Sequence, residues 1–164
     1  MYFRDKYWFL SNMSPASIMF RYESQMFPMS TSEAAFQAHK VYAAQPSVSL
    51  EEKISWLYSL AQADGFESKK LGRQLAIDLD KWKELSYDYM VEVQREKFQV
   101  HSALAEKLVA TGSLELIEDN NHGDTLWGRC NGIGKNQLGV ILMQVRKELY
   151  EQAEEKSIGF VGHS

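Results

Sequence analysis

The sequence predicts a compact single domain that is mainly α-helical (α+β), with a small β element near the N-terminus. The chain has 164 residues, of which 45% are hydrophobic and 24% charged, and this composition is typical of one globular domain with a real core. Its three prolines, Pro15, Pro28 and Pro46, all lie in the first third. The remaining two thirds can therefore form uninterrupted helices, and apolar residues recur there at the helical spacing of three and four positions.

Two short apolar or aromatic runs near the N-terminus, Tyr2-Phe3 and Ile18 to Tyr22, are bounded by Ser, Asn and Pro. Such runs are typical of brief strands, and a pairing between the two is one arrangement that they allow. Helical signals begin at Ser30, because Ser30 and Glu33 have the spacing of a capping box. A helix is therefore predicted from Ser30 to about Ala44, just before Pro46.

The rest of the chain predicts further helices, interrupted by a polar, glycine-rich stretch from Asp119 to Asn136. Leu114 to Ile117 fits either a strand or buried coil. The residues from Ser157 to Ser164 are expected to be loosely ordered, so the predicted division is a domain over 1–154 and a tail over 155–164. The expected helices are 50–63, 66–75, 86–110 with a break near His101-Ser102, and 137–154.

The charge balance and the cysteine content exclude several classes of function. Eighteen basic and 22 acidic residues give a net charge of −4, which argues against binding long nucleic acid through bulk charge but leaves room for a local nucleotide pocket. The single Cys130 excludes a disulfide framework and a multi-cysteine zinc site, and the histidines lack metal-ligand spacing. We therefore expect no metal site.

The predicted location is the cytoplasm, without a membrane. The first ten residues carry Arg4, Asp5 and Lys6 and lack the apolar run of a signal peptide. The apolar stretch from Val140 to Met143 is far too short to cross a bilayer.

The first candidate site is the face of the predicted helix that carries Glu33, Phe36, Gln37 and Lys40. At the helical rise, Glu33 and Lys40 are roughly 10 Å apart along the axis, which leaves room for a sugar between a carboxylate and an ammonium. The alternative is that Glu33 only caps the helix and Lys40 is a solvated surface residue.

The second candidate is the glycine-rich loop that contains Gly128, Gly132 and Gly134 and leads into the last helix. Free N–H groups at the start of that helix are expected to point at a phosphate. The loop is not a Walker A motif, because Arg129 stands where its first glycine belongs and Asn136 where Ser or Thr would bind magnesium. The alternative is a flexible turn with a helix cap.

Three further side chains allow a functional and a structural interpretation. Trp127 fits stacking on a base or a sugar, or a place in the core. Asp124 fits a general base or a turn-forming residue. Arg73, near Lys69 and Lys70, fits a pyrophosphate clamp or a basic helix surface.

Taken in order, these segments resemble the NADAR family, also called YbiA-like, over residues 3–150. The resemblance implies a compact helical YbiA-like fold. It is carried by Leu10-Ser11-Asn12, Ser32-Glu33, Phe36-Gln37-Ala38, Lys40, Leu71-Gly72-Arg73, Lys97-Phe98, Thr111-Gly112, Asp124, Trp127-Gly128, Gly134-Lys135-Asn136, Leu138-Gly139, Leu142-Met143 and Arg146.

The resemblance implies an N-glycosidase that cleaves the bond between ribose C1′ and an exocyclic amine, with no metal or redox cofactor. Glu33 or Asp124 would supply protons and stabilise positive charge at C1′. Lys40 would attack the opened ribose as a Schiff-base nucleophile or pair with a phosphate, and Trp127 would stack and exclude water. The implied substrate-binding residues are Asn12, Phe36, Gln37, Arg73, Gly128, Arg129, Gly134, Lys135 and Asn136.

The sequence departs from the family pattern at Ala34 and Ala35, where members often carry His and an aromatic residue, and at Arg129, where an acidic residue is common. Arg129 favours a more anionic ligand, so the expected substrate is ADP-ribosylated guanine in nucleic acid or nucleosides. The alternatives are phosphoribosylamino-pyrimidine intermediates of riboflavin synthesis and a non-catalytic module that binds ADP-ribose or NAD. No obligate protein partner is predicted. These roles require Glu33 and Trp127 to share one cleft.

Overall fold

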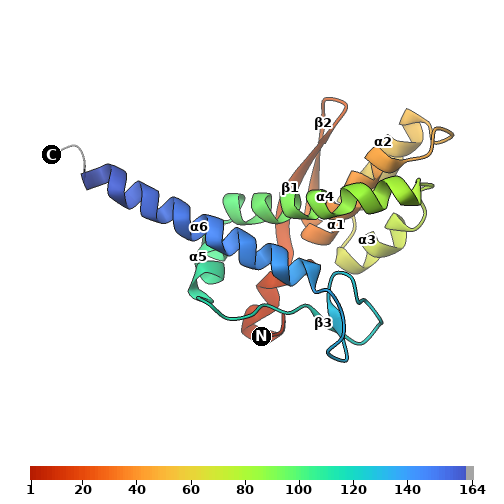
Figure 1. Cartoon of the computed structure of the whole chain (residues 1–164). Helices are drawn as coiled ribbons and strands as arrows, with labels where there is room; N and C mark the ends of the chain where they lie inside the picture. The colour runs from red at the N-terminus through yellow and green to blue at the C-terminus, as the bar shows by residue number, and fades with distance from the viewer. Residues whose placement is uncertain (162–164) are drawn as a thin grey trace. The chain divides into compact units, whose positions relative to one another are not determined.

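The computed structural model describes residues 1–161, and side chains up to residue 159. The chain forms two compact units, one of residues 11–100 and one of residues 1–10 together with the chain from residue 101 onward. Figure 1 shows the elements of both. In chain order they are η1 (Asp5–Leu10), β1 (Pro15–Tyr22), β2 (Gln25–Thr31), α1 (Ser32–Ala38), η2 (His39–Ala43), α2 (Leu50–Ala61), α3 (Gly65–Gly72), α4 (Leu79–Val100), α5 (Ser102–Ala110), β3 (Asp119–Asn120), β4 (Arg129–Cys130) and α6 (Gln137–Val161).

An antiparallel hairpin of β1 and β2 opens the 11–100 unit. Its turn is formed by Glu23 and Ser24, which both have positive φ, as the turns that match strand twist require. Alternate residues of β1 are buried, so one face of the hairpin packs on the unit's core. The strand prediction for Ile18 to Tyr22 is confirmed, but its pairing with Tyr2-Phe3 is wrong, since Tyr2 forms an isolated bridge with Ile117.

The short helix α1 is buried along its whole length. Its N-cap is Thr31, whose Oγ1 accepts the Ala34 N–H at 3.1 Å. The predicted cap at Ser30 is wrong because Ser30 still belongs to β2, and its hydroxyl donates to the Ala63 carbonyl at 2.7 Å. The predicted single helix to Ala44 is likewise divided, since α1 tightens into the 3₁₀ helix η2 after Ala38.

Helices α2, α3 and α4 complete the 11–100 unit, and side-chain caps determine where they begin. Ser49 and Glu52 form a capping box at α2, and Asp64 caps α3. Helix α4 begins well before the predicted Ser86, because the Asp78 carboxylate accepts the N–H groups of the next turn at Asp80 and Lys81. The chain leaves the helix at His101, so the predicted break is confirmed.

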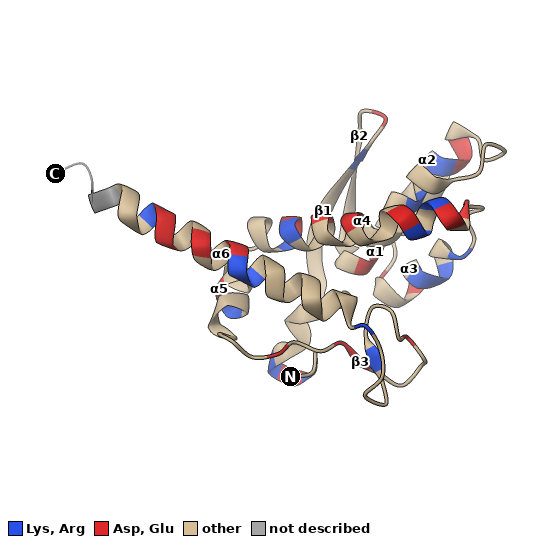
Figure 2. Cartoon of the chain, in the orientation of Figure 1, with Lys and Arg blue, Asp and Glu red and all other residues tan. Residues whose placement is uncertain are grey.

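In the other unit, α6 packs against α5. The described residues from 150 to 159 are exposed, and the colours of Figure 2 mark acidic and basic residues along this part of the helix. The predicted loose segment is wrong as far as Val161, because α6 continues through it, while residues 162–164 lie outside the described residues. The division at residue 154 stays a prediction. The buried stripe of α6 is Leu138, Ile141, Leu142 and Val145.

The content of helix and strand agrees with the predicted mainly α class, with a small β element near the N-terminus. Within residues 1–161, no helix combines the length and the apolar character needed to cross a membrane.

Candidate active site

Glu33 is a buried carboxyl at the first turn of α1. Its side chain is only 5% exposed and Oε1 accepts a hydrogen bond from Gln37 Nε2, one turn along the helix, at 2.9 Å. Burial raises the pKa of Glu33, while the Gln37 hydrogen bond, the charges of Lys69 and Lys40 and a hydrogen bond with Asn12 oppose that rise. Such a carboxyl can hold a proton at a higher pH than an ordinary glutamate, as a general acid requires.

Lys40 lies at the start of η2 and is half-buried. Its Nζ donates to the Gly72 carbonyl at 2.9 Å and lies 5.7 Å from the ring centroid of Trp82. Burial lowers the pKa of Lys40, the charge of Arg73 lowers it further, and Glu33 opposes both. A lysine with a lowered pKa carries a larger neutral, nucleophilic fraction near neutral pH.

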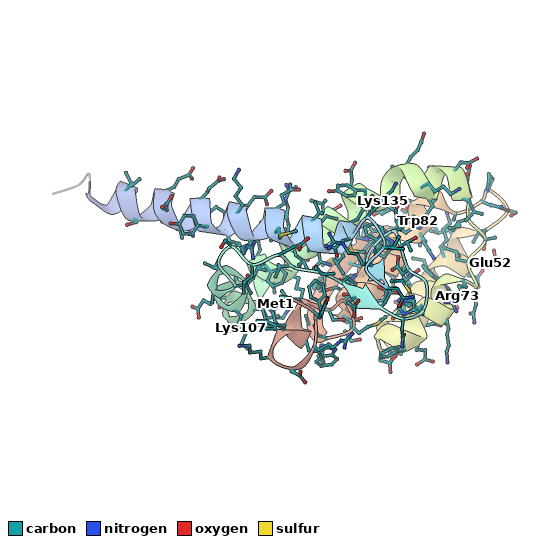
Figure 3. All side chains as sticks on the ribbon, turned by 60° about the horizontal axis from the view of Figure 1, so that its bottom comes forward. Met1, Glu52, Arg73, Trp82, Lys107 and Lys135 are labelled. Atoms are coloured by element: carbon teal, nitrogen blue, oxygen red, sulfur yellow. The ribbon has the colours of Figure 1, made fainter. Side chains whose placement is uncertain are left out.

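A close approach between α3 and α1 holds the Glu33 carboxyl and the Lys40 amine in place. A β-carbon on Gly72 would overlap the amide group of Gln37, so only glycine permits the contact at this point of Leu71-Gly72-Arg73. Arg73, the C-cap of α3, is exposed, which leaves its guanidinium accessible to a ligand. Figure 3 labels it.

An aromatic wall lies beside Lys40. The rings of Phe36 and Trp82 are 5.2 Å apart and tilted at 45°, and Trp82 stacks with Tyr89 at 6.2 Å. Trp82, labelled in Figure 3, is a further candidate site residue, which the sequence alone does not indicate. A tryptophan at the start of an amphipathic helix carries no local signal of function, because such residues usually pack in the core.

The second candidate, the glycine-rich loop, belongs to the other unit and is held together by its own hydrogen bonds. The N–H groups of residues 135, 136, 137 and 138 donate to the carbonyls of residues 125, 128, 126 and 127, at 2.8 to 3.2 Å. The prediction of free N–H groups at the start of α6 is therefore wrong for these four. A phosphate at this loop would have to be bound by other donors.

The glycines of this loop serve close backbone packing. A β-carbon on Gly128 would overlap the Glu118 carbonyl, and one on Gly134, where φ is +145°, would overlap the Gly128 carbonyl. Arg129 pairs with Glu115 at 3.0 Å, and Lys135 is exposed. These contacts favour a structural interpretation of the two glycines.

Asp124 and Asn136 also have structural partners. Asp124 Oδ1 accepts the N–H groups of Leu126 and Trp127, at 3.0 and 2.9 Å, as a turn-forming aspartate does. The Asn136 side chain is buried, accepts the Glu118 N–H and donates to the Leu116 carbonyl. Trp127 is half-buried.

The 11–100 unit therefore brings together one part of the predicted site, namely Asn12, Glu33, Phe36, Gln37, Lys40 and Arg73. The other part belongs to the loop of the second unit, namely Asp124, Trp127, Gly128, Arg129, Gly134, Lys135 and Asn136. That the two sets line one cleft stays a prediction. Within the described part of the chain, no group of three or more His, Cys, Asp or Glu side chains has a geometry that could hold a metal ion.

The NADAR domain model matches residues 1–150. The chain belongs to the NADAR domain family. Its fold is similar to that of the Escherichia coli protein YbiA solved by NMR, with a TM-score of 0.68 and 24% identity over 100% of this chain and 88% of that one.

Two curated relatives are similar in sequence to this NADAR chain. It is 36% identical over 163 residues to a riboflavin biosynthesis protein of Vibrio vulnificus strain YJ016, which covers 96% of this chain and 40% of the relative. It is 37% identical over 82 residues to the N-glycosidase YbiA of Shigella boydii serotype 4, which covers 49% of this chain and 51% of the relative. The matches thus span about half or less of these relatives' own length.

Proposed function

We propose that the chain is an N-glycosidase that hydrolyses the bond between ribose C1′ and an exocyclic amine of a nucleotide-like substrate. The observation that carries the proposal is the pair of Glu33 and Lys40, a buried carboxyl with a raised pKa and a half-buried amine with a lowered pKa within one short helical segment. The name of the Shigella relative, an N-glycosidase, supports it.

Each group has a defined task in this reaction. Glu33 donates its proton to the ribose ring oxygen as the C1′–O bond opens, and the lone pair of the exocyclic nitrogen forms an iminium with C1′. Neutral Lys40 adds to C1′, the amine departs with a proton, and a lysine imine remains. Water then hydrolyses that imine to an aldehyde, and the proton left on Lys40 returns to Glu33, so the reaction consumes one water and restores both groups. If Lys40 instead anchors a phosphate, water adds to C1′ directly.

The first substrate we propose is ADP-ribosylated guanine, in nucleic acid or nucleosides. Arg129 was the residue that favoured this more anionic ligand, and its ion pair with Glu115 weakens that preference. The exposed Arg73 beside Lys40 is a cationic group of the 11–100 unit that suits a phosphate. A phosphoribosylamino-pyrimidine is the second candidate, favoured by the name of the Vibrio relative, a riboflavin biosynthesis protein.

Mass spectrometry of the products tests the activity. The wild-type chain is incubated with ADP-ribosylated guanosine and, separately, with the phosphoribosylamino-pyrimidine. We expect one of them to release its free amine, and Glu33→Gln and Lys40→Met to slow that release by 100-fold or more. Lys83→Met, a change of an exposed lysine on α4, is the matched control and should leave the rate unchanged. Normal rates in both site variants would refute the assignment.

Borohydride added during turnover separates the two roles of Lys40. A lysine imine would be reduced to a stable sugar adduct on Lys40, whereas a phosphate anchor would give none at that residue. Tight binding of ADP-ribose without cleavage of either substrate would instead support a non-catalytic binding module.

A further inference from the structure

The 11–100 unit contains a cavity of about 330 Å³ beside Ala35 and His39. Glu33 and Gln37 lie on another face of α1, because two positions along an α-helix change the direction of a side chain by about 200°. None of Glu33, Gln37 and Lys40 lines this cavity. It is therefore a separate candidate site, with a volume at the lower end of the range of small-molecule sites.

The imidazole of His39 presents a buried lone pair at this cavity. Its side chain is only 9% exposed, and Nδ1 lies 2.8 Å from the Ala35 carbonyl. A carbonyl only accepts hydrogen bonds, so Nδ1 carries the ring hydrogen. Burial lowers the pKa of His39, although the Ala35 hydrogen bond and the charge of Glu92 oppose this. The ring is therefore neutral at pH 7, and Nε2 is an acceptor.

This acceptor faces a second one. Glu92 Oε2 lies 3.8 Å from His39 Nε2, which is beyond hydrogen-bond distance, and no donor of the described residues reaches Nε2. A buried acceptor without a donor is costly. An ammonium group carries three N–H donors, so a single ammonium between the two acceptors would satisfy both.

The charge of the lining also favours a cation. Glu96 lies one turn along α4 from Glu92, and both carboxyl groups line the cavity. Burial raises the pKa of Glu96, and the charge of Glu92 raises it further, because two like charges face the same space. Among the described side chains of the lining, these two carboxyl groups stand against one guanidinium, that of the exposed Arg21.

Aromatic rings surround the His39 imidazole. The ring centroids of Phe20, Tyr89 and Tyr42 lie 4.9, 4.6 and 6.1 Å from that of His39, and all three residues line the cavity. The face of an aromatic ring attracts a cation, and its carbon surface suits an aliphatic chain. Beside the two carboxyl groups, these rings provide a surface for a positive group on an apolar stem.

We propose that this cavity binds a small aliphatic primary ammonium ion, which donates hydrogen bonds to His39 Nε2 and to the Glu92 carboxylate and packs its stem against Tyr89. The proposal does not depend on the N-glycosidase activity, because it uses neither Glu33 nor Lys40. A metal ion fits less well, because no group of three His, Cys, Asp or Glu side chains in the described part of the chain could hold one.

The test is an NMR titration of the ¹⁵N-labelled full chain with n-butylamine at pH 7, where the amine is protonated. 1-Butanol is the uncharged match, and tetramethylammonium is a cation without an N–H. We expect saturable shifts at His39 and Tyr89 with n-butylamine, and binding of the other two weaker by about tenfold or more. No saturable shift with n-butylamine, or equal binding of all three, would overturn the proposal.

A charge-removing variant locates the binding. The Glu92 side chain is 66% exposed, so Glu92→Gln should leave the fold intact and weaken n-butylamine binding by about tenfold or more. The matched control is Glu84→Gln, at an exposed position of the same helix outside the lining, which should bind as the wild type does. Equal losses in both variants would mean that only the surface charge attracts the amine, and would refute the site.

A long-range ¹H–¹⁵N spectrum of His39 gives an independent readout. In the free protein at pH 7 we expect a neutral ring with the hydrogen on Nδ1, and a shift of the Nε2 resonance when n-butylamine binds. A doubly protonated ring would have no acceptor for an ammonium, so that result would contradict the proposal.

Discussion

Gly72 and Gln37 are in such close contact that a β-carbon on Gly72 would overlap Gln37 Oε1. Each residue also holds a group of the candidate site, since the Gly72 carbonyl accepts from Lys40 and the Gln37 amide donates to Glu33. A single contact between α3 and α1 thus fixes both the amine and the carboxyl.

Replacing Gly72 with alanine should therefore damage stability and activity together. The added methyl forces the buried Gln37 amide away from Glu33, and we expect a loss of about 1–3 kcal/mol in the free energy of unfolding, with a matching fall in Tm. The control is Gly159→Ala, near the end of α6, where a β-carbon meets nothing and alanine favours the helix. A Gly72→Ala protein as stable as wild type would contradict the close contact.

Glu33→Gln should gain stability relative to wild type as the pH rises. The folded pKa of Glu33 lies above 4.5, the ordinary value, so the folded protein binds this proton more tightly than the unfolded chain. The stability that this proton gives to the folded wild type is fully present below pH 4.5 and is lost as the pH rises through the folded pKa. Tm measured from pH 4 to 8 should show the difference between variant and wild type growing.

The exposed Glu84 on α4 provides the control for this experiment, since Glu84→Gln should run parallel to wild type across the range. A constant difference between Glu33→Gln and wild type would mean that Glu33 has an ordinary pKa.

The sequence predicts the helices well because their signals are local. Ile54, Leu57 and Tyr58 predict the region of α2, and the break at His101 separates α4 from α5 as expected. Predicted helix boundaries are wrong where a side chain outside the apolar pattern determines where the helix begins. Asp78 starts α4 early through its hydrogen bonds, and the apolar stripe gives no sign of that.

For the candidate site, too, the sequence predicts what depends on local spacing and not what depends on distant contacts. The helical spacing correctly places Glu33 and Gln37 one turn apart on α1, whereas Lys40 lies in the 3₁₀ helix η2 that follows. The buried hydrogen bond from Gln94 to Asn12 could not be predicted, because it joins residues 82 positions apart. The prediction of a phosphate site at the glycine-rich loop rested on its glycines. Glycines that let a phosphate approach the backbone and glycines that let two backbone segments pack closely have the same sequence pattern.

In the wild type we expect the free energy of unfolding to increase with pH, and Lys97→Met should abolish this increase. Burial lowers the pKa of Lys97 to about 7 in the folded chain, against 10.5 ordinarily. The unfolded chain therefore holds this proton where the folded chain has released it, and the free energy of unfolding rises between about pH 7 and 10.5, by up to about 1.4 kcal/mol per pH unit.

Urea unfolding of wild type and variant between pH 6.5 and 9.5 measures this effect. The free energy of unfolding of the wild type should increase relative to that of Lys97→Met as the pH increases. Lys83→Met, an exposed change on the same helix, should show the same pH dependence as the wild type. A pH-independent gap would place the folded pKa of Lys97 near that of a solvated lysine.

Asn136→Asp should destabilise the unit that contains the glycine-rich loop. Aspartate tolerates the positive φ of 51° at this position, and one of its oxygens can still accept the Glu118 N–H. Its other oxygen replaces the Nδ2 that donates to the buried Leu116 carbonyl at 2.8 Å, so two acceptors face each other. We expect a loss of about 2 kcal/mol or more in the free energy of unfolding. Asn121→Asp, at an exposed position of the same loop, should change it little, and equal stability of the two variants would show that the Asn136 amide does not bridge these segments.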